Sequence, residues 1–464
     1  MAAMASAAPL AKALDELRAL FGDRLTTAKA LLDRHGQDES YHLPHPPDAV
    51  VFAHSTDEVV AAVRVCTRHR LAVMPFGAGT SLEGNIAALQ GGLCLDMSGM
   101  NRVLELSTED MDVRVEAGVT RKQLNEYLRD TGLFFPIDPG ADASLGGMAA
   151  TRASGTNAVR YGTMRENVLG LTVVLADGRI IRTGGRAKKS AAGYDLTRLF
   201  VGSEGTLGVI TEVRLKVYGI PEKIGSAVCQ YPSLADAVNS VIVTIQSGIP
   251  VARIELLDEV MMDLTIKYAK LEGYEAKPML FYEFHGTEAS VEEQANMVRA
   301  IADDFGGSAF RWTTSTEERT KLWQARHDSY YAALAPYPGK QGISTDVCVP
   351  ISRLAECILA THQDTRASGF EVPIVGHVGD GNFHCIFVVD IDDKDVMARA
   401  KACNRRLVER AQALGGTCTG EHGVGAGKID FLVAEHGEAV AVMRQLKNAL
   451  DPEGIMNPGK VLRP

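Results

Sequence analysis

The sequence predicts an α+β fold with two or three domains, and three observations support this. At 464 residues the chain is too long for one ordinary hydrophobic core. Short apolar runs alternate with amphipathic stretches, as strands and helices do. The 45 glycines gather at 77–84, 140–162, 202–208 and 415–427. Such clusters are typical of loops around a ligand, because glycine lets the backbone come close to it.

The first half of the chain alternates strands and helices after an N-terminal helical segment, 1–42. The Pro-rich stretch 42–47 follows, and a helix cannot cross it. The elements expected next are, in order, strand 49–53, helix 56–70, strands 72–75, 92–96 and 112–116, helix 121–129, and strands 168–175 and 209–217. We therefore expect a domain over 43–220 that ends near Ile220-Pro221.

The second half repeats a β-α-β order twice, which predicts a compact antiparallel α+β domain over 221–414. A C-terminal segment, 415–464, closes the chain. The elements expected are strand 224–231, helix 234–247, strands 254–257 and 279–285, helices 290–304 and 316–334, strand 343–349, helix 352–368, two strands around 379–382, and helices 395–414 and 429–450.

Composition excludes several classes of protein. The formal net charge of −10 argues against a nucleic-acid partner, which would need a basic face. No run of about 18 apolar residues is present, so no transmembrane helix is expected. The N-terminus resembles neither a secretory signal nor a transit peptide, since Asp15 and Glu16 come early. We expect a cytoplasmic location, with peripheral attachment to the inner membrane as an alternative.

The stretch 75–85, PFGAGTSLEGN, predicts a site for a diphosphate. It follows the apolar run 71–74, and its three glycines, with Thr80 and Ser81, can form a concave nest of N–H groups and hydroxyls. It is neither the GxGxxG nor the GxxxxGK[ST] motif, which argues against a Rossmann NAD site and a P-loop. Taken alone, such a motif is more often a Gly-rich surface turn.

Three further loops of small residues support a ligand-binding interpretation of the first. They lie at 139–148, at 153–162 and at 202–208, and the last of them precedes the strand that begins at Val209. Small side chains let a large flat ligand approach the backbone. Four such loops in one region favour a binding site over chance.

The segment 373–390, PIVGHVGDGNFHCIFVVD, predicts a second site. Asp380-Gly381 between two apolar runs is a hairpin signal. A hairpin centred on that pair would place His377 opposite His384, with Cβ atoms about 5 Å apart. That spacing suits two ligands of one metal ion, and two histidines held in the core are the alternative. Glu421 is the third candidate ligand, because two histidines and a carboxylate suit Zn²⁺, Mn²⁺ or Fe²⁺.

These motifs resemble a known family. Residues 45–220 are similar to the FAD-binding domain of the vanillyl-alcohol-oxidase/p-cresol-methylhydroxylase flavoproteins. The remainder resembles the branch of FAD-linked D-lactate dehydrogenases, glycolate oxidase catalytic subunits and D-2-hydroxyglutarate dehydrogenases. The resemblance implies a ferredoxin-like cap domain and a C-terminal helical segment that returns to the FAD domain. It implies non-covalent FAD, because the first loop has no histidine. The residues that it assigns to FAD are Pro75, Gly77, Ala78, Gly79, Thr80, Ser81, Gly84, Pro139, Gly140, Leu145, Gly146, Gly147, Ser154, Gly155, Glu204, Gly205, Ile210 and Asn457.

The same resemblance implies roles for residues of the second site. His377, His384 and Glu421 would hold a divalent metal, Zn or Mn, and His422 would be the catalytic base. Two further residues would contact the substrate. Arg326 would bind its carboxylate, a natural role for a guanidinium, and Asn382 would lie beside the metal and the substrate.

The implied activity is oxidation of a small D-2-hydroxy acid to the 2-keto acid, with D-lactate as first choice. D-2-hydroxyglutarate and glycolate are the alternatives within the family. Electrons would pass to a separate acceptor such as cytochrome c, a quinone or an electron-transfer flavoprotein. A homodimer is one of the expected oligomeric states. Two hypotheses of another class are a divalent-metal nucleotide hydrolase without FAD and an inactive flavin-fold subunit of a larger complex.

Overall fold

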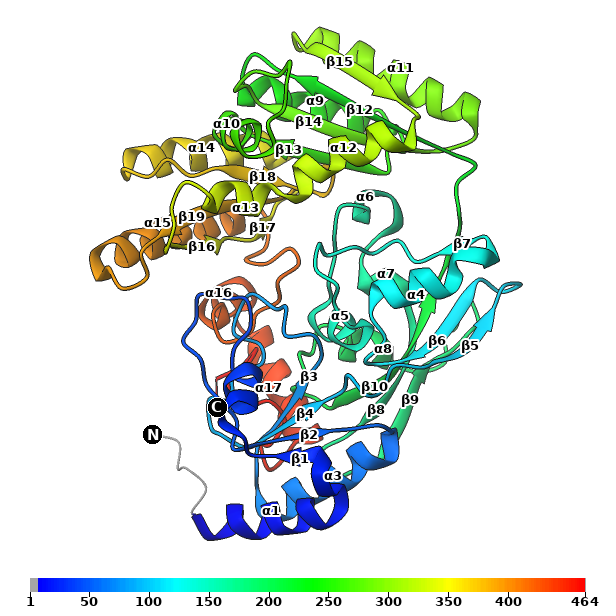
Figure 1. Cartoon of the computed structure of the whole chain (residues 1–464), viewed down its shortest axis with the longest axis vertical. Coiled ribbons are helices and arrows are strands. Elements are labelled where there is room, and N and C mark those ends of the chain that lie inside the picture. Colours follow the sequence, from blue (N-terminus) through cyan, green and yellow to red (C-terminus); the bar gives the residue numbers. More distant parts are fainter. Residues whose placement is uncertain (1–6, 464) are drawn as a thin grey trace. The chain divides into compact units, whose positions relative to one another are not determined.

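The structure, a computed structural model, describes residues 7–463, and the contacts within the chain divide it into two units (Figure 1). Unit 1 consists of Met1–Ser154, Gly162–Ile220 and Glu421–Pro464, and unit 2 of Gly155–Tyr161 and Pro221–Gly420. Each unit mixes helices and sheets, which confirms the predicted α+β class. Residues 1–6 of the predicted N-terminal helical segment lie outside the described residues. Within 7–463, no helix is long and apolar enough to span a membrane.

Unit 1 begins with a four-stranded sheet of order β1-β2-β4-β3. Its elements are α1 (Ala7–Phe21), the 3-10 helix η1 (Gly22–Arg24), β1 (Leu25–Thr26), α2 (Lys29–His35), β2 (Ala49–Phe52), α3 (Thr56–His69), β3 (Val73–Phe76) and β4 (Leu93–Asp96). β2, β4 and β3 are parallel, and β1 is antiparallel to β2. Helices α1 and α3 pack against each other and share a core with the sheet that includes Leu17, Val51 and Val63 (Figure 1). α3 begins where the Ser55 hydroxyl accepts a hydrogen bond from the N–H of Glu58.

The second sheet of unit 1 is antiparallel, with the order β5-β6-β10-β8-β9. Its strands are β5 (Val103–Ser107), β6 (Asp112–Glu116), β8 (Val168–Val174), β9 (Ile180–Gly184) and β10 (Val209–Lys216). The alternation seen in the sequence of β10 is real: Val213 and Leu215 are buried, whereas Arg214 and Lys216 are half-buried. The other elements of unit 1 are α4 (Arg121–Leu128), η2 (Arg129–Thr131), β7 (Leu133–Phe134), α5 (Leu145–Thr151), α7 (Met164–Asn167), α8 (Leu196–Phe200), β11 (Tyr218–Gly219), α16 (Ile429–His436) and α17 (Ala439–Leu450).

Unit 2 is built on an eight-stranded antiparallel sheet of order β15-β12-β14-β13-β18-β19-β16, with β17 paired to β19. The strands are β12 (Lys223–Gln230), β13 (Arg253–Leu257), β14 (Met279–Gly286), β15 (Ser308–Thr313), β16 (Gln341–Ser344), β17 (Val347–Cys348), β18 (Ile374–Gly376) and β19 (Asn382–Val389). The helices are α6 (Ala158–Tyr161), α9 (Leu234–Gln246), α10 (Glu259–Ala269), α11 (Glu288–Asp304), α12 (Thr316–His327), α13 (Ser329–Leu334), α14 (Leu354–Ala367) and α15 (Lys394–Ala413), with the 3-10 helices η3 (Ile351–Arg353) and η4 (Val378–Asp380).

Three predicted elements are interrupted in the structure. The predicted helix 316–334 consists of α12 and α13, which meet at Asp328. The predicted strand 343–349 is divided into β16 and β17, because Thr345 uses its carbonyl and hydroxyl oxygens to accept hydrogen bonds from His384 and Cys385. The predicted helix 429–450 breaks at Gly437, whose φ of +50° is not helical.

The buried carboxyl of Asp258 makes the stability of unit 2 depend on pH. Burial raises the pKa of Asp258 to about 7, although its carboxylate caps α10 by accepting the N–H of Met261. The pKa of this acid is higher in the folded state than in the unfolded state, where it is about 4. The free energy of unfolding therefore falls as pH rises from the lower pKa to the higher one. We expect Asp258→Asn to unfold at a higher temperature than wild type at pH 8, and the difference to shrink at pH 5. An equal difference at both pH values in thermal unfolding would contradict this.

Candidate active site

Unit 1 contains a cavity whose wall joins the glycine-rich loops of that unit. The space is about 1200 Å³, part of it open to solvent. The residues of its wall that the sequence assigned to FAD are Pro75, Gly77, Ala78, Gly79, Thr80, Ser81, Pro139, Gly146, Gly147, Ser154, Glu204, Gly205, Ile210 and Asn457. Loops that lie far apart in the sequence therefore surround one space.

Close packing explains why glycine occupies key positions in this wall. A Cβ atom on Gly77 would lie 2.1 Å from the Ser144 hydroxyl oxygen, and one on Gly146 would lie 2.5 Å from Cβ of Ala117. Ser144 itself accepts a hydrogen bond from the N–H of Gly147 at 3.3 Å. Any side chain at Gly77 would displace Ser144, so the first and second loops are in direct contact through backbone and small atoms.

Four residues that the sequence assigned to FAD do not line this cavity: Gly84, Gly140, Leu145 and Gly155. Leu145 is fully buried in the core beneath the five-stranded sheet, because it is the first apolar residue of α5. Gly84 and Gly140 have φ values of +70° and +83° and serve as turns of the chain. Gly155 belongs to unit 2.

Buried Glu204 joins the C-terminal segment to the wall of the cavity. Its carboxylate accepts hydrogen bonds from the N–H groups of Val424 (2.7 Å) and Gly425 (2.8 Å) and from Nδ2 of Asn85 (2.6 Å). The Asn457 amide donates to the backbone oxygen of Glu204 at 2.7 Å. Burial raises the pKa of Glu204, and these N–H donors oppose the rise. Sequence reasoning missed Asn85 as a residue of this wall, although it ends the first glycine loop.

Glu421 and His422 also line the cavity of unit 1. The His422 ring is almost fully buried, and its Nδ1 lies 3.8 Å from Oε1 of Glu83. The same oxygen pairs with Nζ of buried Lys428 at 2.9 Å. The two residues expected to hold a metal and to act as the base therefore share a wall with the residues expected to hold FAD.

In unit 2, the structure corrects the predicted pairing of the two hairpin histidines. β18 and β19 pair with Val375, not His377, opposite His384, so the predicted register is wrong. A two-residue type I′ turn needs a positive φ at both of its central residues. Only Gly381 has one (+82°), and Asp380 instead ends the 3-10 turn η4. The two rings are nevertheless close, with centroids 5.6 Å apart and planes at 81°.

Hydrogen bonds fix the tautomers of both histidines. Nδ1 of His377 lies 2.7 Å from Oε1 of Glu255, and Nδ1 of His384 lies 2.8 Å from the carbonyl oxygen of Thr345. Both partners are acceptors, so Nδ1 carries the proton and Nε2 carries the lone pair in the neutral ring. Bonds of this kind are typical of histidines that bind a metal through the other nitrogen.

Arg326 extends from α12 to Glu255, a carboxylate in the middle of β13. Glu255 is 0% exposed, and its Oε2 accepts a hydrogen bond from Nε of Arg326 (2.9 Å) and forms an ion pair with Nη2 (2.6 Å). Burial alone would raise the pKa of Glu255, but the neighbouring His377 and Arg326 outweigh it and hold the pKa below its usual value. Sequence reasoning missed Glu255; a single acidic residue within the apolar run Ile254–Leu257 was the available signal.

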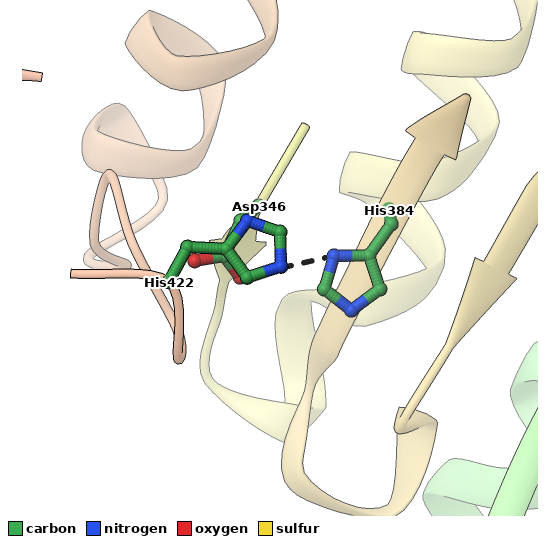
Figure 2. Close-up of side chains that lie close together, drawn as sticks. All are labelled: Asp346, His384 and His422. Atoms are coloured by element: carbon green, nitrogen blue, oxygen red, sulfur yellow. Dashed lines mark ion pairs between the residues drawn. The ribbon is translucent and has the colours of Figure 1, made fainter. Parts of the chain in front are cut away.

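Asn382 is held at the start of β19. Its amide nitrogen donates to Oδ1 of Asp346 and to the carbonyl oxygen of Val347, both at 2.8 Å. Asp346 is buried, and the same Oδ1 lies 3.9 Å from Nδ1 of His384 (Figure 2). These bonds direct the side-chain oxygen of Asn382 away from Asp346. His422, which Figure 2 also draws, belongs to unit 1.

Comparisons with known proteins agree with this architecture. The family model "FAD binding domain" matches residues 47–184, and "FAD linked oxidases, C-terminal domain" matches 220–461. A Danio rerio protein named probable D-lactate dehydrogenase, mitochondrial, is 54% identical over 99% of this chain and 93% of its own. An Arabidopsis thaliana D-lactate dehydrogenase [cytochrome], mitochondrial, is 46% identical over 97% and 80% of the two chains. The solved structure of p-cresol methylhydroxylase with substrate bound has the same fold, with a TM-score of 0.83, 18% identity, and coverage of 99% and 98%.

These findings also settle two expectations from the sequence. The expected cytoplasmic location is wrong, since both relatives are named mitochondrial proteins. The expectation of an FAD-linked oxidoreductase is confirmed, and this argues against a nucleotide hydrolase without FAD. With one family model matching more than half of the chain and a relative 54% identical over nearly all of it, the chain belongs to the FAD-linked oxidase family.

Proposed function

We propose that this protein is a divalent-metal-dependent dehydrogenase that oxidises D-lactate to pyruvate and passes the electrons to a separate acceptor. The observation that carries the proposal is the cavity of unit 1, whose wall joins the FAD loops to Glu421 and His422. The names of the Danio and Arabidopsis relatives support D-lactate as the substrate. The second name also supports a cytochrome as acceptor and, with the first, a mitochondrial location.

The residues of the cavity fit FAD. The glycine-rich loops give the wall many small side chains, and the hydroxyls of Thr80 and Ser81 follow Gly79, whose φ is +73°. A backbone in this conformation presents N–H groups to an anion such as a diphosphate. When bound, FAD supplies the acceptor for the hydride that leaves carbon 2 of the hydroxy acid.

The donor set of unit 2 fits a divalent cation such as Zn²⁺ or Mn²⁺. The Nδ1–H groups of His377 and His384 each donate to an acceptor, so each ring would bind the cation through Nε2. Glu421 stays the predicted third ligand. When bound, the cation supplies Lewis-acid polarisation of the substrate hydroxyl.

The other site residues would bind the substrate and move its proton. Arg326 would hold the carboxylate, because a guanidinium matches its geometry and charge. Asn382, held through its amide nitrogen, would lie beside the metal and the substrate. His422 would take the hydroxyl proton on Nε2, since its Nδ1 lies beside Glu83 and the nearby carboxylate stabilises the imidazolium that forms.

Turnover of a panel of acids tests the choice of substrate. Relatives named glycolate oxidase subunit and D-2-hydroxyglutarate dehydrogenase make these two acids the competitors. We expect kcat/KM with an artificial electron acceptor to be highest for D-lactate. A higher kcat/KM for glycolate or D-2-hydroxyglutarate would keep the chemistry and change the substrate. No turnover of any of the three acids by the FAD-loaded protein would overturn the proposal.

Gly77→Ala should reduce the amount of bound FAD. The new methyl group would lie 2.1 Å from the Ser144 hydroxyl oxygen and would push the first loop away from the second. The measurement is the ratio of flavin to protein after purification. Gly185→Ala is the matched control, since a Cβ there meets nothing within 4 Å. Equal flavin content in the two variants would contradict the placement of FAD between these loops.

A further inference from the structure

We propose that Glu255 is a positioning residue that holds the predicted substrate-binding Arg326 and the predicted metal ligand His377 in their working orientations. This inference rests on the proposed function, because the roles of Arg326 and His377 come from it. It concerns contacts within unit 2 only, since all three residues belong to that unit.

The cost of burying Glu255 is the first argument. A carboxylate that is 0% exposed is expensive to bury unless charged partners satisfy both of its oxygens. Here Oε1 accepts a hydrogen bond from Nδ1 of His377 at 2.7 Å, and Oε2 accepts one from Nε of Arg326 at 2.9 Å and forms an ion pair with its Nη2 at 2.6 Å. The partners come from positions 71 and 122 residues away in the chain. One buried carboxylate thus joins two residues with different proposed tasks.

The donors of Arg326 show what Glu255 does for substrate binding. A guanidinium has five N–H donors, one on Nε and two on each terminal nitrogen. Glu255 accepts a hydrogen bond from Nε and forms an ion pair with Nη2, and the Ser329 hydroxyl accepts a hydrogen bond from Nη1 at 3.2 Å. Glu255 therefore covers the Nε side of the guanidinium, and the donors left for a substrate carboxylate are those of the two terminal nitrogens. Glu255 therefore determines which edge of Arg326 is available to the substrate.

The hydrogen bond between Glu255 and His377 orients the predicted metal ligand. His377 lies in the loop after β18, outside the strand ladder, so the ladder does not fix its ring. The Glu255 carboxylate fixes the ring by its Nδ1 proton and makes Nε2 the basic nitrogen. A carboxylate behind a metal-binding histidine raises the basicity of the ligand, and its loss typically weakens metal binding about 10- to 100-fold.

The variant Glu255→Gln separates this role from simple packing. Glutamine has nearly the same shape, but it carries one acceptor oxygen and one NH₂ donor, so it cannot accept from both Arg326 and His377. We expect the Kd for Mn²⁺, measured by calorimetric titration of chelator-treated protein, to rise about 10- to 100-fold. KM for D-lactate should rise by about 10-fold or more, because the substrate would lose one hydrogen bond to a charged group. FAD content should match wild type.

Glu283→Gln is the matched control. Glu283 is a buried carboxylate on the neighbouring strand β14, and it is also bonded to a histidine and an arginine, His285 at 2.8 Å and Arg253 at 3.4 Å. Its replacement removes a buried charge from the same sheet without touching Arg326 or His377. We expect it to leave the Kd for Mn²⁺ unchanged.

Several outcomes decide the inference. Equal Mn²⁺ affinity and equal KM in Glu255→Gln and Glu283→Gln would overturn it. If wild type binds no Mn²⁺, the metal part of the proposed function fails, and the inference is then decided by KM alone. If Glu255→Gln does not fold, Glu255→Asp takes its place, with a smaller loss of metal affinity expected in the same direction. In a His377→Ala background, Glu255→Gln should cause no further loss of Mn²⁺ affinity, whereas a full additional loss would contradict the coupling.

Discussion

The His422→Asn variant is expected to turn over D-lactate about 10²- to 10⁴-fold more slowly than wild type, which is the usual contribution of a general base. His422 lines the cavity of unit 1 and has Glu83 beside its Nδ1 to stabilise the protonated ring. Asparagine retains polarity at the site but cannot accept the proton. The measurement is kcat at saturating D-lactate, with the bound FAD quantified in the same samples.

His436→Asn is the matched control, because this histidine of α16 is well exposed and lies outside the cavity wall. It should turn over D-lactate like wild type. The base acts only as a neutral imidazole, so the wild-type rate should fall at acidic pH, and the His422→Asn variant should lose that dependence. A kcat for His422→Asn within a few-fold of wild type would exclude the proposed proton transfer.

The His384→Ala variant is expected to lose metal binding and turnover while FAD remains bound. His384 is buried on β19, and the bond from its Nδ1 to Thr345 directs Nε2 to the proposed ligand position. Loss of a residue behind a ligand already weakens binding about 10- to 100-fold, so loss of the ligand itself should exceed this. Metal content after dialysis against Mn²⁺ and kcat with D-lactate are the two measurements.

FAD should be retained in His384→Ala because the cavity of unit 1 contains no residue of β19. His285→Ala is the matched control in unit 2, since this buried histidine of β14 bonds to Glu283 at 2.8 Å and has no proposed role. Normal turnover in His384→Ala would exclude the metal role of this residue. Loss of FAD together with metal would point to misfolding of the variant.

Much of the fold could be predicted because local signals and tertiary packing agree. The strand 112–116 matches β6, and the helix predicted over 56–70 starts where α3 starts, because Ser55 caps it. α3 ends one residue earlier than predicted, because Arg70 has a φ of +52°. The breaks at Asp328, Thr345 and Gly437 were missed. They depend on backbone geometry and on hydrogen bonds to distant residues, which a pattern of apolar residues does not contain.

Some residues of the candidate site could likewise be predicted from the sequence, and others could not. The glycine loops could be recognised because their small residues are visible in the sequence. This holds without knowledge of the tertiary contacts that bring the loops together. The buried partners Glu255, Asp346 and Asn85 could not, because each acts through residues that are distant along the chain. The register of the two histidines failed because the turn signal at Asp380-Gly381 fits more than one hairpin geometry.

The most direct test of the central claim is anaerobic mixing of the purified, FAD-loaded protein with D-lactate while the visible absorption of the flavin is recorded. We predict rapid bleaching with D-lactate, none with L-lactate, and loss of the reaction after removal of metal with EDTA, restored by Mn²⁺ or Zn²⁺. This result would establish the chemistry, the stereochemistry and the metal requirement together. Bleaching that is equally fast with both lactates, or unaffected by EDTA, would contradict the account.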